Sequence, residues 1–375
     1  MSEALTGLEL QSMVTSGGEL QLILADITLD PPGADDVIVK VEAAPINPSD
    51  LALLLGPADI STLKAGGTAD RPTLTATVPP QRMAAIAARL DQPMPVGNEG
   101  AGTVVQAGEN ARHLLGKKVG MIGGAMYTQY RKLPARDVVA VPEGASAADG
   151  ASMFINPLTA LGFVETMRAE GHKAIVHTAA ASNLGQMLNR LCLADGVPLV
   201  NIVRSDAQAA ILRGIGATHI VDSSAPDFEA ALTNAIAETG ATLGFDAIGG
   251  GKLAGQILAA MEAAANRSAV GYNRYGSTTY KQVYIYGMLD VGPTIINRTF
   301  GFSWGLGGWL LMPFLMKAGQ EVTARLRQRV ADELTTTFAS HYTATISLAD
   351  VLRPEIVEAY QRKTTGEKYL IDPSL

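Results

Sequence analysis

From about residue 152, short apolar runs of strand length alternate with longer runs of helical periodicity. The runs "KAIVHTA", "PLVNIVR", "THIVDSS" and "LGFDAIGG" are each followed by a helical segment, and "RSAVGYN" and "QVYIYGML" read as further strands. Strands that alternate with helices of this length form βαβ units. The pattern therefore predicts an α/β fold with a doubly wound parallel sheet over residues 152–335, covered by helices on both faces and ending in a helix at about 311–335.

The rest of the chain is rich in strands. Short apolar or alternating runs such as "QLILADITL" and "DDVIVKVEAAPI" lie within residues 1–151, and "EKYLID" near the C-terminus reads as one more strand. We therefore expect a β-rich domain made of residues 1–151 and 336–375. Residues 56–97 read as an irregular insertion with one short helix at "PPQRMAAIAARLD". We expect this insertion to roof a pocket, with surface decoration or a subunit contact as the alternative.

Composition excludes several classes of protein. The net charge is −7 and the basic residues are scattered, which argues against a nucleic-acid partner. The single cysteine, Cys192, excludes an internal disulfide and a zinc site built on several thiolates. No secretory signal is visible at the start. The longest apolar run, residues 300–316, is short of the roughly 20 residues that span a membrane. We expect a cytoplasmic protein that makes no membrane contact.

The stretch "HTAAASNLGQ", residues 177–186, joins the first of these strands to the helix that follows it. A dinucleotide-binding turn carries three glycines here, which permit a tight turn and close approach of the backbone to a pyrophosphate. In this chain the three positions hold Ala180, Ser182 and Gly185. Ala and Ser are the smallest substitutes, and Ser182 or Asn183 can cap the helix. The turn is a candidate nucleotide site, although a strand, turn and helix without glycines is also common.

The end of the second strand, "VNIVRSDAQ", bears on which nucleotide would bind. An NAD-binding protein places Asp or Glu there, whereas this chain has Arg204 followed by Ser205. A guanidinium matches a phosphate bidentately, and a hydroxyl adds a hydrogen bond. These residues favour the 2′-phosphate of NADPH. Two alternatives stay open, because Asp206 could accept from a ribose hydroxyl and Arg204 could be an ordinary surface residue.

Several segments, in their order and spacing, resemble the medium-chain dehydrogenase/reductase superfamily over nearly the whole chain. They are "EAAPINPSDL", "PVGNEGAGTVVQAG", "NPLTALGFVE", "HTAAASNLGQ", "GATHIVDSS", "FDAIGGG" and "YIYGML". The sequence is most similar to the zinc-independent quinone reductase and 2-enoyl-thioester reductase branches, the latter through "AAASNLGQ" and "NIVRS". The resemblance implies a GroES-like catalytic domain, a Rossmann cofactor domain, NADPH as the cofactor and a homodimer in which residues 300–316 form the interface.

Zinc-dependent members of that superfamily bind the catalytic metal through a Cys in the segment matching "INPSD" and a His in the segment matching "GNEG". These positions hold Asn47 and Asn98, and amides are poor zinc ligands. We therefore expect no metal, which disfavours alcohol oxidation because nothing obvious would stabilise the alkoxide. Hydride transfer from NADPH to a conjugated C=C bond or a quinone remains, since the carbonyl of such an acceptor takes up the charge.

The resemblance also implies where the site residues lie. Asn47 would lie beside the nicotinamide and donate to a substrate carbonyl, with a turn residue before Pro48 as the alternative. Enoyl-thioester reductases have a catalytic Tyr soon after this segment, but "LALLLGPADIS" has none. Tyr127 is the tyrosine expected to line the cleft, unless it is buried for structural reasons. The implied cofactor residues are Thr159, Ala181, Ser182, Asn183, Leu184, Gly185, Arg204, Ser205, Ile248, Gly249, Gly287 and Met288.

The function expected from these observations is NADPH-dependent reduction of a small electrophilic substrate, either an α,β-unsaturated carbonyl compound or a quinone. Two alternatives remain open. One is an enoyl-thioester reductase. The other is a non-catalytic NADPH-binding scaffold, which the missing Tyr and the replaced glycines allow.

Overall fold

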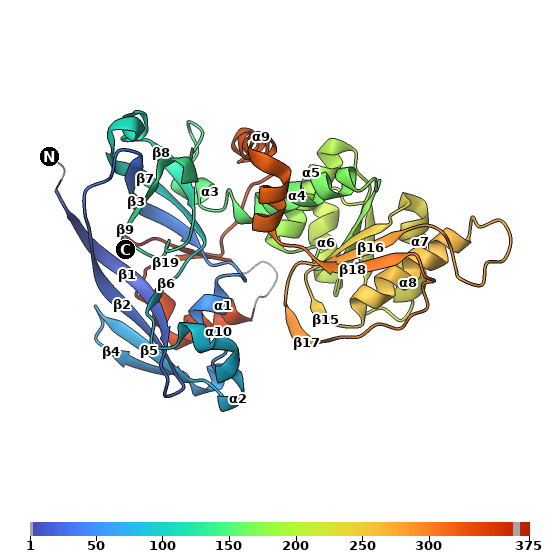
Figure 1. Ribbon diagram of the computed structural model, residues 1–375, viewed down its shortest axis with the longest axis horizontal. Coiled ribbons are helices and arrows are strands. Elements are labelled where there is room, and N and C mark those ends of the chain that lie inside the picture. The colour runs from blue at the N-terminus through green and yellow to red at the C-terminus, as the bar shows by residue number, and fades with distance from the viewer. Residues whose placement is uncertain (1–2, 363–367) are drawn as a thin grey trace. The chain divides into compact units, whose positions relative to one another are not determined.

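The computed structural model describes residues 3–362 and 368–375. The chain divides into two compact units, residues 1–155 with 327–375 and residues 156–326 (Figure 1). These limits differ from the expected 151/152 and 335/336. Residues 327–335 belong with the first unit because the Arg327 guanidinium donates to the Arg136 carbonyl and lies 5.7 Å from the ring centroid of Phe154.

The first unit contains two antiparallel-rich sheets. In one sheet the strand order is β4-β5-β2-β1-β6, and in the other it is β10-β8-β7-β3-β20-β19 with β9 also paired to β3. The strands are β1 (Leu5–Val14), β2 (Glu19–Leu29), β3 (Asp36–Pro45), β4 (Lys64–Gly67), β5 (Pro72–Thr77), β6 (Met94–Pro95), β7 (Glu99–Ala107), β8 (Lys118–Ile122), β9 (Tyr130–Pro134), β10 (Val138–Ala140), β19 (Ala344–Ile346) and β20 (Tyr369–Ile371). The helices and 3₁₀ turns are α1 (Leu51–Leu54), η1 (Ile60–Thr62), α2 (Pro80–Met83), η2 (Ala84–Arg89), η3 (Glu109–Leu114), η4 (Ala135–Asp137), α3 (Ala147–Gly150), η5 (Asp350–Leu352) and α10 (Pro354–Gln361).

The expectation that residues 56–97 are irregular is wrong. Strands β4 and β5 form a hairpin that extends the sheet beyond β2, and β6 pairs with β1. In β5 the buried Leu74 and Ala76 alternate with more exposed threonines, which is the pattern of a half-buried strand. The expected single helix is a short turn of α-helix followed by a 3₁₀ segment, interrupted where Ile86 leaves the helical region.

The second unit contains the predicted parallel sheet, in the order β13-β12-β11-β14-β16-β18. Its strands are β11 (Ile175–His177), β12 (Leu199–Val203), β13 (His219–Asp222), β14 (Leu243–Asp246), β16 (Lys281–Ile285) and β18 (Trp304–Gly308), and β15 (Gly249–Gly251) pairs separately with β17 (Asp290–Thr294). Its helices are α4 (Ile155–Ala169), α5 (Asn183–Asp195), α6 (Asp206–Gly214), α7 (Phe228–Thr239), α8 (Leu253–Asn266) and the first part of α9 (Leu311–Asp332). The α/β fold class is confirmed.

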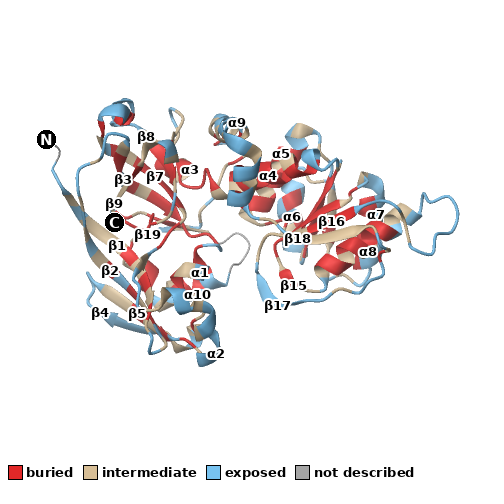
Figure 2. Cartoon of the chain, viewed as in Figure 1, coloured by how far each residue is buried: buried red, intermediate tan, exposed pale blue. Residues whose placement is uncertain are grey.

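Burial in this unit concentrates on the strands and on the inner faces of the helices, as Figure 2 shows. The strand expected at "RSAVGYN", residues 267–273, is wrong: these residues lie in an exposed connection between α8 and β16. The sheet instead takes β18, from within the apolar segment 300–316, as the parallel neighbour of β16. In the part of the chain that the structure describes, no helix is both long enough and apolar enough to cross a bilayer.

Candidate functional site

The turn after β11 is shaped for close approach of backbone to backbone. Ala179 has φ +50°, in the left-handed region that costs a residue other than glycine some strain. Ser182 caps α5, and its Oγ accepts from the Gly185 amide at 3.1 Å. A Cβ atom on Gly185 would lie 2.2 Å from the Ala180 carbonyl oxygen, so only glycine fits there without displacement of the turn.

This turn lies at the carboxyl end of β11, the strand at which the strand order of the parallel sheet reverses. Strand β11 pairs with β12 on one side and with β14 on the other, and the chain winds outward from it in both directions. Ligands of open α/β sheets bind at the carboxyl edge, beside this change of direction. The first amides of α5 and the helix dipole favour an anion at the same place.

Arg204 follows the last residue of β12 and has an exposed side chain. Its backbone amide donates to Gln208 Oε1 at 3.0 Å, which fixes the start of α6, and its guanidinium has no partner among the described residues. Ser205 caps α6, since its Oγ accepts from the Gln208 amide at 3.3 Å. The cap uses an acceptor site of this hydroxyl and leaves its proton for an anion beside Arg204.

Asp246, at the end of β14, connects the loop that follows β14 to the turn after β11 through hydrogen bonds. Its carboxylate is fully buried and accepts from the Thr178 hydroxyl at 2.8 Å and from the Ile248 and Gly249 amides at 2.9 and 3.2 Å. Gly287, after β16, also has no space for a Cβ, which would lie 2.5 Å from the Ala247 carbonyl oxygen. No sequence pattern indicates a role for Thr178, although its hydroxyl joins the ends of the first and fourth strands of the unit, β11 and β14.

The other expected cofactor residues differ in how far their side chains are exposed. Thr159, Ala181 and Leu184 are buried at 6%, 1% and 8% exposure, so their side chains are largely occupied by packing. Met288 is 70% exposed. A ligand at this edge would therefore meet Ala181 and Leu184 mainly through the backbone.

In the first unit, Asn47 belongs to a buried polar cluster. Its amide nitrogen donates to Glu99 Oε1 at 2.9 Å, and its backbone amide donates to Asp50 Oδ2 at 2.8 Å. Asp50 Oδ1 accepts from the Asn98 amide at 2.9 Å, while Asn98 Nδ2 donates to Ser49 Oγ at 3.0 Å. Asn47 is 2% exposed, and its Oδ1 has no hydrogen-bond partner among the residues that the structure describes. The expectation that Asn47 offers a donor is thus revised, because the atom left over is an acceptor.

Burial shifts the pKa values of the carboxyl groups in this cluster. Desolvation raises the pKa of Asp50 to about 7. The hydrogen bonds that Asp50 accepts from the Asn47 and Asn98 backbone amides oppose this rise, and the nearby Glu99 charge adds to it. Desolvation also raises the pKa of Glu99, against the opposing effects of Lys368 and of hydrogen bonds from the Ile155, Asn47 and Phe154 groups. Paired carboxyl groups of raised pKa are typical of functional sites.

Tyr127 does not line a cleft. It is fully buried among apolar side chains, and its hydroxyl donates to the Pro45 carbonyl at 3.1 Å. Desolvation raises the pKa of this phenol well above its usual value, with the Asp50 charge adding to the effect. A phenol held in this way packs the core and is a poor proton donor, so the expectation of a catalytic Tyr127 is corrected.

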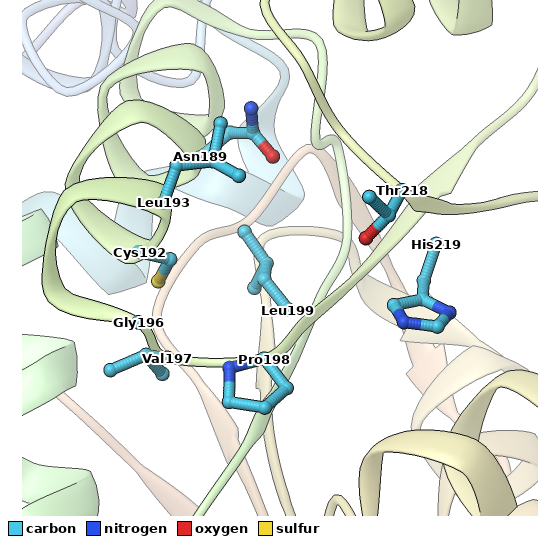
Figure 3. Close-up of a pocket in the computed structure, with 9 residues that line it drawn as sticks. All are labelled: Asn189, Cys192, Leu193, Gly196, Val197, Pro198, Leu199, Thr218 and His219. Atoms are coloured by element: carbon cyan, nitrogen blue, oxygen red, sulfur yellow. The ribbon is translucent and has the colours of Figure 1, made fainter.

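Within the described residues, no group of three or more His, Cys, Asp and Glu side chains could hold a metal ion. A cavity of about 280 Å³ lies at the opposite, amino-terminal edge of the parallel sheet (Figure 3). Cys192, Pro198 and His219 are among the residues that line it. Burial raises the pKa of the Cys192 thiol, which makes it a poor nucleophile. This cavity is separate from the turn after β11.

The chain is similar to known oxidoreductases in sequence and in structure. The sequence profile of the alcohol dehydrogenase GroES-like domain matches residues 33–143. A protein assigned as an NADPH:quinone reductase from Mesorhizobium loti has a solved structure that aligns with 100% of this chain and 99% of its own, with a TM-score of 0.71 and 26% identity. The Etr1p complex with NADP and crotonyl-CoA shares the fold, with a TM-score of 0.66 and 17% identity, over 98% of this chain and 100% of its own.

Among curated sequences, the mitochondrial enoyl-[acyl-carrier-protein] reductase of Xenopus tropicalis is 28% identical over 219 residues. The match covers 55% of this chain and 53% of that protein, so the chain spans about half the length of the curated relative.

Proposed function

We propose that this chain, which matches the alcohol dehydrogenase GroES-like domain over residues 33–143 and aligns over its whole length with the structure of an NADPH:quinone reductase, is an NADPH-dependent reductase of activated C=C bonds or quinones that acts without zinc. The observation that carries the proposal is the turn after β11. In this turn, Gly185 has no room for a Cβ, and Ser182 caps the start of α5. Both lie at the point where the strand order of the parallel sheet reverses.

The residues of the second unit fit the parts of NADPH. The start of α5, with Ser182, Asn183, Leu184 and Gly185, suits the pyrophosphate, and Arg204 with Ser205 suits the 2′-phosphate. The remaining proposed contacts are Thr159, Ala181, Ile248, Gly249, Gly287 and Met288. Bound NADPH would supply the hydride, so the protein's part is to orient the acceptor and manage its charge and protons.

The first unit supports an acceptor that needs no Lewis acid. Asn47 and Asn98 stand where zinc-dependent relatives have ligands, and both amides are engaged with neighbouring side chains. A conjugated carbonyl or a quinone takes up the charge on its own oxygen. Enoyl thioesters are a second candidate substrate class, favoured by the 28% identity with an enoyl-[acyl-carrier-protein] reductase.

Nucleotide selectivity tests the cofactor assignment. We expect Arg204→Ala to weaken NADPH binding at least tenfold and to leave NADH binding nearly unchanged, because a hydrogen-bonded charge contact contributes about 1.5–3 kcal/mol and only NADPH has the extra phosphate. Fluorescence titration of both nucleotides measures this. Arg213→Ala, an exposed arginine in the last turn of α6, is the matched control and should change neither affinity. If the unmodified protein binds neither nucleotide, the reductase proposal fails and a scaffold role gains support.

We also propose that two copies pair through β18. Among the described residues, this strand lies at one edge of the parallel sheet. Its outer backbone N–H and C=O groups can pair with another strand. The neighbouring Phe302, Leu310, Met312 and Met316 are 77%, 65%, 53% and 74% exposed, which is unusual for a monomer. Light scattering should report a dimer, and Leu310→Asp with Met312→Asp should raise its dissociation constant at least tenfold. Leu193→Asp, at another exposed apolar residue, should leave it unchanged; a monomeric unmodified protein contradicts the proposal.

A further inference from the structure

A chain of hydrogen bonds in the first unit ends at a lysine that the sequence analysis did not single out. Lys368 Nζ donates to Ser152 Oγ at 2.7 Å, and Ser152 Oγ lies 2.8 Å from the Tyr342 hydroxyl. The Tyr342 hydroxyl donates to the Ala148 carbonyl at 3.2 Å. Since that carbonyl can only accept, the direction of the chain is fixed: the ammonium donates to Ser152, Ser152 to Tyr342, and Tyr342 to Ala148.

Lys368 also lies near two buried carboxyl groups. Glu99 and Asp50 both act on the Lys368 charge, and the Tyr342 ring centroid lies 5.3 Å from Nζ. The Glu99 oxygens already accept from Asn47 Nδ2 and from the Phe154 and Ile155 amides. Among the described residues, Ser152 is the hydrogen-bond partner that the structure gives the ammonium, which can donate three hydrogen bonds.

Ser152 suits both protonation states of this lysine. Its Oγ accepts from the ammonium and can accept equally from an N–H group of the neutral amine, so proton loss leaves the chain of hydrogen bonds in place. Desolvation lowers the pKa of Lys368 to about 8, against the opposing effect of the Glu99 and Asp50 charges. A proton that can leave near neutral pH is what a general acid requires.

We propose that Lys368, positioned by Ser152 and Tyr342, is the general acid that protonates the substrate carbon after hydride transfer to a C=C bond. The inference rests on the proposed function and names the proton donor for it. When hydride reaches the β-carbon, the electron pair of the C=C bond moves into the conjugated carbonyl and gives an enolate. The enolate α-carbon then forms a bond to a Lys368 proton, the N–H bonding pair stays on Nζ, and water returns a proton to the neutral amine.

The other polar groups of the cluster are less suited to this step. The Tyr127 hydroxyl is buried in the core and donates to Pro45. The Tyr342 hydroxyl donates to Ala148, and burial raises its pKa, with the Glu99 and Asp149 charges adding to the effect. Asn47 has no titratable proton. Ser152 and Tyr342 are therefore positioning residues.

The test compares an enone with a quinone as acceptor, because a hydroquinone is protonated on oxygen, which exchanges protons with water without a catalyst, whereas an enolate must be protonated on carbon. We expect Lys368→Arg to keep the positive charge but lower the ratio of enone to quinone turnover at least tenfold, since a guanidinium does not release its proton at these pH values. In the unmodified protein, enone turnover should fall above pH about 8, where the amine is neutral, and Lys368→Arg should lose this fall. Lys64→Arg, on the exposed strand β4, is the matched control and should leave the ratio unchanged.

A second readout needs neither cofactor nor substrate. An NMR pH titration of protein labelled at lysine Cε should show one signal with a midpoint near 8, which is absent in Lys368→Arg and shifted in Ser152→Ala. An unmodified protein that reduces neither acceptor contradicts the proposed function, whatever the titration shows. An active enzyme whose Lys368→Arg variant keeps both the turnover ratio and the fall above pH 8 overturns the inference alone.

Discussion

Replacing Lys281 by methionine is expected to lower the free energy of unfolding of the second unit by about 3–5 kcal/mol, because it leaves a buried carboxylate without its counter-ion. Lys281 is fully buried at the start of β16, and its Nζ lies 2.6 Å from Glu262 Oε2 on α8. Glu262 also accepts from the backbone amide of Ser277 at 2.7 Å and from its hydroxyl at 2.5 Å. The pair thus connects β16, α8 and the exposed connection between them.

Both tryptophans, Trp304 and Trp309, lie in the second unit, so denaturant unfolding followed by tryptophan fluorescence reports on that unit. Arg325→Met is the matched control. Its ion pair with Glu165 is of similar length, 2.9 Å, but the arginine side chain is 56% exposed, and the expected cost is below about 1 kcal/mol. Equal costs for the two variants would show that burial does not set the contribution of the pair.

The same ion pair predicts how stability depends on pH. Burial raises the pKa of Glu262, but hydrogen bonds from Lys281 and Ser277 outweigh it and lower the pKa from 4.5 to about 2. A carboxyl group whose pKa is lowered by folding stabilises the folded state above its unfolded pKa. That stability is lost as the pH falls from about 4.5 through 2. Lys281→Met should reduce this dependence on pH, which denaturation curves at several pH values measure.

Gly185→Ala is expected to weaken NADPH binding about 100-fold, or by about 2–3 kcal/mol. The new Cβ would lie 2.2 Å from the Ala180 carbonyl oxygen and 2.6 Å from its carbon, so the turn and the start of α5 must separate by about 1 Å. A displacement of this size at a group that positions a ligand costs about two orders of magnitude. Fluorescence titration with NADPH measures the loss.

The control for this substitution is Gly214→Ala, at the end of α6. Its φ is not positive and a Cβ there would meet no atom within 4 Å, so nucleotide binding should stay unchanged. Unaltered NADPH affinity in Gly185→Ala would falsify the assignment of the turn after β11 as the pyrophosphate site. Circular dichroism of the variant would separate loss of the site from loss of the fold.

The local sequence determined the architecture of the second unit. Periods of two and of about 3.6 residues act between near neighbours along the chain, and they gave the strands β11 to β14 and β16 and the helices α5 to α8. The local pattern predicted the wrong structure where strand pairing between distant segments decided which residues form a strand. Residues 267–273 lie in an exposed connection, and the strand that pairs with β16 is instead β18. The threonine-rich residues 72–77 become a strand because β2 offers an edge to pair with.

The same distinction applies to the candidate site. The turn after β11 and Arg204 could be found from sequence, because their residues are adjacent and follow a recognisable strand. Tyr127 was misplaced because burial depends on the whole core that closes around it. Lys368 could not be found at all: its partner Ser152 is 216 residues away, and a single sequence carries no signal for that contact. Sequence alone determined which segments become strands and helices in the second unit, whereas the tertiary structure decided which distant side chains share a buried environment and hence which protons can move.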